Sequence, residues 1–209
     1  MTKEKGLHVL YDIDGCPKEI VAPLVRHVKE DFGVDLPSYE DTRVYDLSAV
    51  YRRPWSEIAL WIRSLYFSPK FLEIPPEPGA VEAFKRLFAD GSHRSNGVTT
   101  RPIDIEHITL AYFARHFAPG SYGIIHHLSP AQGHGHTPKR KGNMALELNG
   151  DLFIEDCFDH ATDIAGLGIP VLLFNRPWNA QEVLPKGLPI TRVFDWPEIV
   201  RRIEGRDYA

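Results

Sequence analysis

The stretch LHVLYDIDG, residues 7–15, decides the expected architecture of this 209-residue chain. Residues 7–11 form a short, largely apolar run, and Asp12, Ile13, Asp14 and Gly15 follow it directly. Such a run is typical of a buried strand that ends at a polar turn. In an α/β sheet, turns at the carboxyl ends of the strands are the usual place for a site. The sequence therefore predicts a buried strand that delivers two carboxylates to a functional site.

The remainder of the chain alternates between helical and extended patterns. Helices are expected over about 20–33, 56–65, 81–88, 104–117, 143–148 and 159–167, and strands before Thr99 and over 122–128, 151–156 and 170–174. This alternation predicts βαβ units, and hence an α/β fold with a parallel sheet and helices on both faces. The strand before Thr99 is weakly marked because residues 94–96 are polar, and no element is assigned after residue 179.

Composition narrows the class of protein. The chain is 43% hydrophobic and 25% charged with a net charge of −4, which suits one compact unit, or a core with one insertion, and argues against polymeric nucleic acid as a partner. Two cysteines without CxxC spacing indicate a reducing, cytoplasmic setting. No apolar run approaches the ~18 residues of a membrane span, and residues 1–6 lack a leader-like apolar region, so a soluble, unprocessed protein without a membrane partner is expected. The oligomeric state is not indicated.

Residues 37–78 are unusually rich in Tyr, Trp and Arg and leave through the proline-rich segment 75–78. We interpret this block as a helical insertion over the site. It carries Tyr39, Tyr45, Tyr51, Trp55, Trp61 and Tyr66 beside Arg43, Arg52, Arg53 and Arg63. Flat apolar rings beside cationic donors suit a nucleobase and its phosphate. Packing of these aromatics inside the insertion is the alternative, and for Tyr51, Trp55, Trp61 and Tyr66 it is the favoured one.

Three carboxylates indicate a metal site. Asp12 and Asp14 are two residues apart at a tight turn, and Asp156 ends a second apolar strand. The carboxyl ends of parallel strands converge on one edge of a sheet, so these groups should meet there. Buried carboxylates at such spacing need a cation or a shared proton. An all-oxygen set favours Mg²⁺ over zinc.

With Mg²⁺ in place, the residue types fit the demands of phosphoryl transfer. Asp12 can attack phosphorus, and Asp14 can protonate the leaving alcohol and later deprotonate the hydrolytic water. Thr99 can donate a hydrogen bond to a phosphoryl oxygen, and Lys141 can balance the negative charge. The sequence thus predicts a phosphomonoester hydrolase that works through a phospho-aspartate.

The same residues carry a family resemblance. DIDG at 12–15, Thr99, Lys141 and the Glu-Asp pair at 155–156 resemble the four motifs of the haloacid dehalogenase (HAD) superfamily in their order. VTTRP at 98–102, LFIEDCFDHA at 152–161 and GIPVLLFNRPWN at 168–179 resemble the bacterial branch of the 5′(3′)-deoxyribonucleotidase family. The resemblance implies a Rossmann-like core over 1–15 and 79–209, a helical cap over 16–78, and dephosphorylation of nucleoside monophosphates.

The resemblance also implies roles for individual residues. Asp12 and Asp14 would be catalytic, and Thr99, Thr100 and Lys141 would bind the substrate phosphate. Asp12, Asp156 and the backbone carbonyl of Asp14 would hold Mg²⁺. Lys139 and Arg140 remain competitors of Lys141, which is preferred because Gly142 and a helical stretch follow it.

Other readings remain open. A HAD phosphatase for another small phosphorylated metabolite uses the same residues, and a catalytically idle HAD-like binding protein is a third possibility. Asp14 argues against a dehalogenase, because attack on carbon needs no acid/base at that position. The histidines at 126, 127, 134 and 136 leave a zinc site as a less favoured alternative, since no paired cysteine accompanies them.

Overall fold

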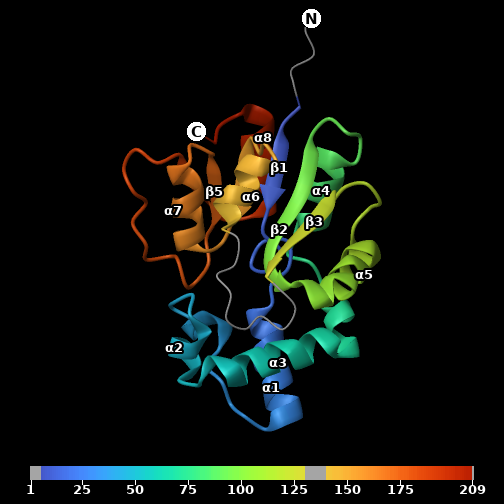
Figure 1. Ribbon diagram of the computed structural model, residues 1–209, viewed down its shortest axis with the longest axis vertical. Helices are drawn as coiled ribbons and strands as arrows, with labels where there is room; N and C mark the ends of the chain where they lie inside the picture. The colour runs from blue at the N-terminus through green and yellow to red at the C-terminus, as the bar shows by residue number, and fades with distance from the viewer. Residues whose placement is uncertain (1–5, 130–139, 209) are drawn as a thin grey trace, which may run out of the picture.

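The computed structural model describes residues 6–129 and 140–208. Within these ranges six parallel strands form one sheet in the order β3-β2-β1-β4-β5-β6 (Figure 1). The strands are β1 (His8–Tyr11), β2 (Arg94–Pro102), β3 (Ile124–Ser129), β4 (Leu152–Glu155), β5 (Val171–Phe174) and β6 (Ile190–Val193). β1 lies in the middle, paired in parallel with β2 and β4. The predicted parallel α/β fold is confirmed.

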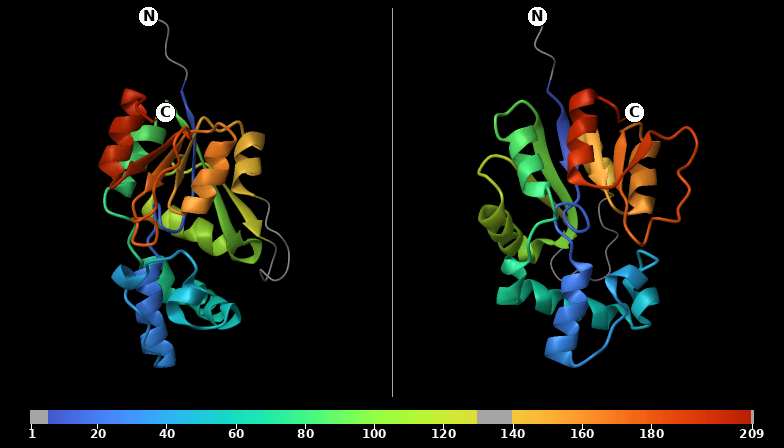
Figure 2. Two further views of the ribbon diagram at one scale, coloured as in Figure 1. Left: turned by 90° about the vertical axis from the view of Figure 1, so that its left-hand side faces the viewer. Right: turned by 180° about the vertical axis from the view of Figure 1, so that it is seen from behind.

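Helices cover both faces of the sheet (Figure 2). α4 (Ala80–Phe88), α5 (Glu106–His116, preceded by η3, Ile103–Ile105) and α8 (Trp196–Gly205) pack on one face, and α6 (Lys141–Glu147) and α7 (Phe158–Gly166) on the other. Successive side chains of β1 point to opposite faces of the sheet. Val9 and Tyr11 belong to the hydrophobic cluster under α4, α5 and α8, and Leu10 belongs to the cluster under α6 and α7. Because both faces are covered, the strand is apolar throughout instead of alternating.

The segment between β1 and α4 lies beyond the carboxyl ends of the strands, at the bottom of Figure 1. It contains α1 (Val21–Phe32), η1 (Tyr39–Asp41), α2 (Leu47–Tyr51), α3 (Trp55–Phe67) and η2 (Pro69–Glu73). We call α1, α2 and α3 the cap helices. They pack through buried Leu24, Val28, Ile58 and Leu65. The exact division into core and cap at residues 15 and 79 stays a prediction.

Two parts of the sheet differ from expectation. β2 is nine residues long despite its polar start, because neighbours satisfy its side chains: the Ser95 hydroxyl donates to the Ser121 carbonyl (3.0 Å), and the Asn96 amide contacts His126 (3.2 Å). β6 and α8 follow residue 179, where no element was expected. β6 pairs with β5, and α8 begins where the Asp195 carboxylate accepts from the Glu198 amide (2.6 Å).

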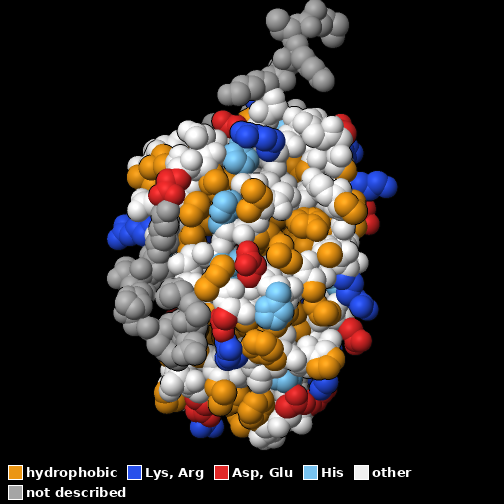
Figure 3. All heavy atoms as spheres, turned by 45° about the vertical axis from the view of Figure 1, so that its right-hand side comes forward, with side chains coloured by type: hydrophobic (Ala, Val, Ile, Leu, Met, Phe, Trp, Pro, Cys, Tyr) orange, Lys and Arg blue, Asp and Glu red, His pale blue; other side chains and the backbone are white. Residues whose placement is uncertain are grey.

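On the face seen in Figure 3, cationic and anionic side chains are interspersed among hydrophobic ones. None of the helices in the described ranges combines the length and the apolar character needed to cross a bilayer. Cys16 and Cys157 are both buried free thiols, consistent with a packing role.

Lys18, just after the turn at β1, is completely buried. Its ammonium lies over two rings, 4.1 Å from the centre of Phe71 and 3.7 Å from that of Tyr112, and donates to the Phe71 carbonyl (3.4 Å). Burial, aided by the charge of Arg101, lowers the pKa of Lys18 to about 6, although Asp14 opposes the change. This lysine therefore folds into a place that disfavours its charged form.

Replacing Lys18 by methionine should stabilise the protein in a pH-dependent way. The unfolded lysine keeps its proton below about pH 10.4, whereas the folded one loses it above about pH 6, so folding expels a proton in that window. The gain in unfolding free energy of Lys18→Met over the parent should grow as pH falls from 10 to 6. Urea unfolding across this range measures it. Lys85→Met, at an exposed position of α4, is the control, and equal pH profiles for the two variants would refute the assignment.

Candidate active site

The turn after β1 is built around Gly15. The Asp12 amide donates to the Ile154 carbonyl (2.9 Å), which ties the end of β1 to β4. Gly15 has φ +79°, and a Cβ there would lie 2.0 Å from Oδ2 of Asp156. Only glycine combines this backbone conformation with such a close approach. The turn can therefore bring the Asp156 carboxylate directly against the loop that carries Asp12.

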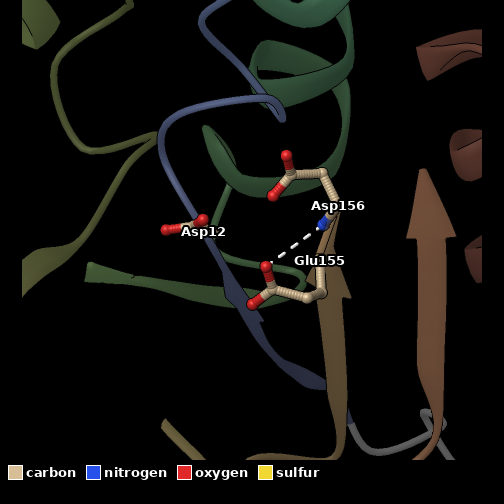
Figure 4. Close-up of side chains that lie close together, drawn as sticks. All are labelled: Asp12, Glu155 and Asp156. Carbon is tan, nitrogen blue, oxygen red and sulfur yellow. Dashed lines mark hydrogen bonds between the residues drawn. The ribbon is translucent and has the colours of Figure 1, made fainter. Parts of the chain in front are cut away.

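Asp12, Glu155 and Asp156 gather at the adjacent ends of β1 and β4 (Figure 4). One oxygen from each carboxylate lies within 4.8 Å of the others, and all three residues are buried. Lys141, the first residue of α6, places Nζ 2.8 Å from Oδ2 of Asp12 and 2.8 Å from Oε2 of Glu155. We call these four residues the carboxylate cluster.

The carboxylates in the cluster have different partners. Glu155 is fully engaged: Oε2 binds Lys141, and Oε1 accepts from the backbone amides of Asp156 (3.2 Å) and Cys157 (3.1 Å). Oδ1 of Asp156 is buried without a hydrogen-bond partner among the described residues. A buried carboxylate oxygen of this kind is costly unless a cation or donor reaches it. Asp156 therefore has capacity left for a ligand.

The pKa shifts of the three carboxylates also indicate that the cluster can accept a cation. Burial raises the pKa of Asp12 to about 6, with Glu155 adding to the rise and Lys141 opposing it. Burial and the charges of Glu155 and Asp12 raise the pKa of Asp156 well above its ordinary value. For Glu155 burial acts upward too, but Lys141 and His160 outweigh it and lower its pKa. One ammonium cannot neutralise three carboxylates, so the donors present fit a hard, oxygen-preferring cation such as Mg²⁺.

The segment NRPWN at 175–179 fixes the backbone of this site. The Asn179 amide donates to the carbonyls of Asp156 (2.6 Å) and Phe174 (2.8 Å), and the Trp178 indole donates to the Asp156 carbonyl (3.1 Å). Nε of Arg176 donates to the Gly15 carbonyl (2.7 Å). This segment therefore positions both turns that carry the carboxylates.

Asp14 faces a different set of groups. Arg101 Nε and Nη2 lie 2.8 and 2.5 Å from its two carboxylate oxygens, and the Tyr66 hydroxyl donates to Oδ2 (3.3 Å). Arg101 is itself buried, and its Nη1 donates to the Thr109 hydroxyl (3.1 Å). Sequence reasoning assigned no role to Arg101. Its position in VTTRP, where a cation follows two polar residues near a strand end, is the sequence feature that could have identified Arg101 as a site residue.

The expected phosphate contacts come from β2 and α6. Thr99 is buried in β2, and its hydroxyl accepts from the Arg101 amide (3.2 Å). Among the competing cations, Lys141 contacts the carboxylates, whereas Arg140 pairs with Asp163 (3.0 Å) at the surface. Lys139 lies outside the described residues.

Two of the four histidines that were considered as zinc ligands lie within the described residues. His126 contacts Asn96, and His127 lies 3.2 and 3.1 Å from the carbonyls of Arg101 and Pro102. His134 and His136 lie outside the described residues. Within those residues, the group of side chains placed to hold a metal ion is Asp12, Glu155 and Asp156, which contains no histidine.

Two cavities at Asp14 lie between the cap helices and the carboxyl ends of the strands, and Trp55, Ile62 and Tyr66 line both. The first, of about 370 Å³, extends to Asp156, Tyr45 and Trp178, and we call it the Asp156 cleft. The second, of about 580 Å³, extends to Thr100, Arg101 and Ser129, and we call it the Thr100 cleft.

Aromatic residues of the insertion fall into two groups. Tyr51 and Trp61 are buried in the apolar core, as the packing alternative expected. The favoured packing interpretation is wrong for Trp55, which is 53% exposed and lines both clefts, whereas buried Tyr66 belongs to the core and also donates to Asp14. Of the four arginines in the insertion, only Arg63 lines either cleft, and it pairs with Asp104 (2.6 Å). The expected mixture of rings and cations is therefore only partly realised around Asp14.

Comparison with known proteins supports the fold. No protein-family model matches the chain. Solved structures with the same fold include a haloacid dehalogenase-like hydrolase from Streptococcus pneumoniae (TM-score 0.61, 13% identity, 96% of this chain and 98% of that one). A HAD-superfamily hydrolase of subfamily IA from Geobacter sulfurreducens (0.56, 17%, 95% and 97%) and the L-2-haloacid dehalogenase of Xanthobacter autotrophicus (0.61, 12%, 96% and 99%) are also similar.

One curated protein is similar in sequence. A nucleotidase from Clostridium acetobutylicum is 30% identical over 105 residues, which are 49% of this chain and 46% of that protein. The matched region thus spans about half of each chain. The structural neighbours include a dehalogenase, so the fold is compatible with more than one reaction.

The variant Asp156→Asn should separate stability from metal binding. Without divalent cations it should be more stable than the parent at pH 7, because the raised pKa of Asp156 penalises folding increasingly as pH rises above about 4. Mg²⁺ at a hundred times its Kd should stabilise the parent by about 2.7 kcal/mol and leave the variant unchanged. Thermal and urea unfolding with and without Mg²⁺ measure both effects.

Glu155→Gln is the matched control, and it should destabilise by roughly 3–5 kcal/mol because it leaves Lys141 without one of its buried partners. A parent protein indifferent to Mg²⁺ would contradict the assignment of the cluster.

Proposed function

We propose that this chain, which has the haloacid dehalogenase-type fold, is a phosphomonoester hydrolase that works through a phospho-aspartate on Asp12. The observation that carries the proposal is the meeting of Asp12, Lys141 and Asp156 at the ends of β1, α6 and β4, with Asp14 two residues from the nucleophile. The dehalogenase reaction requires neither an acid/base at Asp14 nor a cation site. An idle binding protein would have no reason to keep carboxylates that disfavour one another's charge.

Each residue then has one task. Asp12 attacks phosphorus, and the ion pair with Lys141 keeps its carboxylate anionic and oriented. The same ammonium, with donors from Thr99 and Thr100, offsets the charge that develops on the phosphoryl oxygens. Glu155 acts through Lys141 and the backbone amides of 156 and 157, so it is a positioning residue.

A divalent cation fits Asp12 and Asp156, with the backbone carbonyl of Asp14 as a further ligand. When bound, Mg²⁺ supplies positive charge to the phosphate and relieves the repulsion within the cluster. The uncompensated Oδ1 of Asp156 supports this placement.

Asp14 protonates the leaving oxygen and later takes a proton from the hydrolytic water. In the structure both its oxygens accept hydrogen bonds from Arg101, and Tyr66 of α3 adds a third. Proton transfer therefore requires this contact to loosen. Because Tyr66 belongs to the cap helices, movement of the cap would change the partners of Asp14.

We propose nucleoside monophosphates as the substrate class, in the manner of a 5′(3′)-deoxyribonucleotidase. Tyr45, Trp55, Tyr66 and Trp178 line the Asp156 cleft and offer flat apolar faces beside Asp14. Tyr45 is 47% exposed, and the desolvation of its phenol together with the charge of Asp156 raises its pKa, so this ring lies near the carboxylates at the rim of the cleft. The similar protein from Clostridium acetobutylicum is named a nucleotidase, which supports this choice over other phosphorylated metabolites.

Two substitutions test the catalytic roles. Asp12→Asn should lower kcat by at least about 10⁴-fold, since an amide cannot form the acyl phosphate. Asp14→Asn should lower it by about 10²- to 10⁴-fold for alkyl phosphates, and by much less for 4-nitrophenyl phosphate, whose leaving group needs little protonation. Steady-state kinetics with both esters measure this difference. Equal losses with the two esters would exclude the general-acid role of Asp14.

A substrate screen tests the substrate class. Base stacking contributes ~1–3 kcal/mol, so kcat/KM for nucleoside monophosphates should exceed that for ribose 5-phosphate by about ten- to a hundredfold. Trp55→Ala should reduce this preference, with Trp61→Phe in the cap core as a control for packing. If no nucleotide surpasses phenyl phosphate, the nucleotidase proposal fails and the phosphatase proposal stands.

A further inference from the structure

The two clefts at Asp14 differ in charge. Four carboxyl residues line the Asp156 cleft, namely Asp14, Glu19, Asp46 and Asp156, and among the described residues no lysine, arginine or histidine does so. The Thr100 cleft is lined by Arg63 and Arg101 and by one acidic residue, Asp14. A phosphomonoester whose leaving group entered the first cleft would meet rings and carboxylates. One that entered the second would meet two guanidinium groups.

The expected position of the phosphate indicates which of the two clefts holds the leaving group. The proposed nucleophile and cation site lie at Asp12 and Asp156, and the Asp156 cleft is the one that Asp156 lines. Arg101 in the other cleft is engaged with Asp14, and Arg63 with Asp104, so neither guanidinium is free for a ligand without breaking an ion pair. The leaving group therefore belongs in the Asp156 cleft.

We propose that the Asp156 cleft selects against leaving groups that carry a second negative charge, so that the substrates are monophosphates of neutral or cationic, partly flat alcohols. This inference rests on the proposed phosphatase function. Asp14 is paired with Arg101 and Asp156 belongs to the proposed cation site, so Glu19 and Asp46 are the remaining acidic groups of the cleft. A second phosphate or carboxylate there would lose water without gaining a cationic side chain from the described residues, beside carboxylates of like charge. Burial raises the pKa of Glu19 to about 7, so its repulsion weakens below neutral pH, while the described lining of the cleft offers no cation in its place.

The residues that could control the charge of the leaving group include Asp46 and Leu47, at the start of α2. Leu47 lines the cleft, and the Asp46 carboxylate caps the helix by accepting from the Ser48 amide (2.8 Å). A cationic side chain at position 47 would therefore enter a cleft whose described lining has carboxylates and no cationic side chain. It should admit an anionic leaving group that the parent rejects, which makes Leu47 a specificity-determining position.

The test uses three aryl phosphates that differ only in a remote group: 4-carboxyphenyl, 4-(hydroxymethyl)phenyl and 4-(aminomethyl)phenyl phosphate. With Mg²⁺ and the full-length chain, kcat/KM for the carboxylate should be at least tenfold below that of the neutral ester, and the amine should equal or exceed it. A deoxynucleoside 5′-monophosphate and its 3′,5′-bisphosphate form a second pair with the same expected order.

Leu47→Arg should raise kcat/KM for the anionic ester relative to the neutral one by at least fivefold, while Leu47→Gln should not change the ratio. Arg63→Gln, in the Thr100 cleft, should leave the ratio unchanged. Equal rates for the three parent esters, or a ratio that changes with Arg63→Gln and not with Leu47→Arg, would overturn the inference and leave the phosphatase proposal intact. Failure to hydrolyse any of the esters would instead refute the proposed function. If Leu47→Arg does not fold, the parent series alone decides.

Discussion

The rest of the structure depends on the burial of three carboxylates around one ammonium at the junction of β1 and β4. Asp12, Glu155 and Asp156 are too close for Lys141 alone to balance them, and the raised pKa values of Asp12 and Asp156 express that imbalance. A fold maintains such an arrangement only when the backbone around it is fixed. Much of the surrounding architecture serves this requirement.

That architecture comes from distant parts of the chain. Asn179 and Trp178 hold the backbone of Asp156, and Arg176 holds Gly15. The Arg176 guanidinium also pairs with Glu77 (2.6 Å), in the segment that returns from the cap helices. The Glu77 amide in turn donates to the Pro17 carbonyl (2.9 Å), so the two linkers to the cap lie side by side. The carboxyl turns and the linkers of the cap are thus joined by one continuous set of hydrogen bonds and ion pairs.

Charge is distributed unevenly within this unit. On one side Arg101 neutralises Asp14 and lies against Tyr66, and on the other the Asp156 cleft has acidic and aromatic walls without a cation among the described residues. In the proposed reaction the phosphoryl group needs positive charge, which Lys141 and a cation held by Asp12 and Asp156 would supply. If the proposed phosphatase function is correct, the cleft for the leaving group can be apolar and acidic, and the two ends of a substrate meet environments of opposite character.

The sequence by itself determined the parallel sheet and the edge at which the carboxylates meet, because an apolar run followed by carboxylates is a local pattern that repeats at β1 and β4. It also placed Lys141 just before a helix, expected over 143–148, and in the structure Lys141 is the first residue of that helix. It underrated β2, whose polar residues are satisfied by Ser121 and His126, and gave no sign of β6 or α8, whose burial depends on neighbours already in place. Only the tertiary structure decided that Arg101 binds Asp14 and that the arginines of the insertion stay out of the Asp156 cleft. Those contacts join residues far apart in the chain, and side-chain direction across a cleft has no periodic signature in sequence.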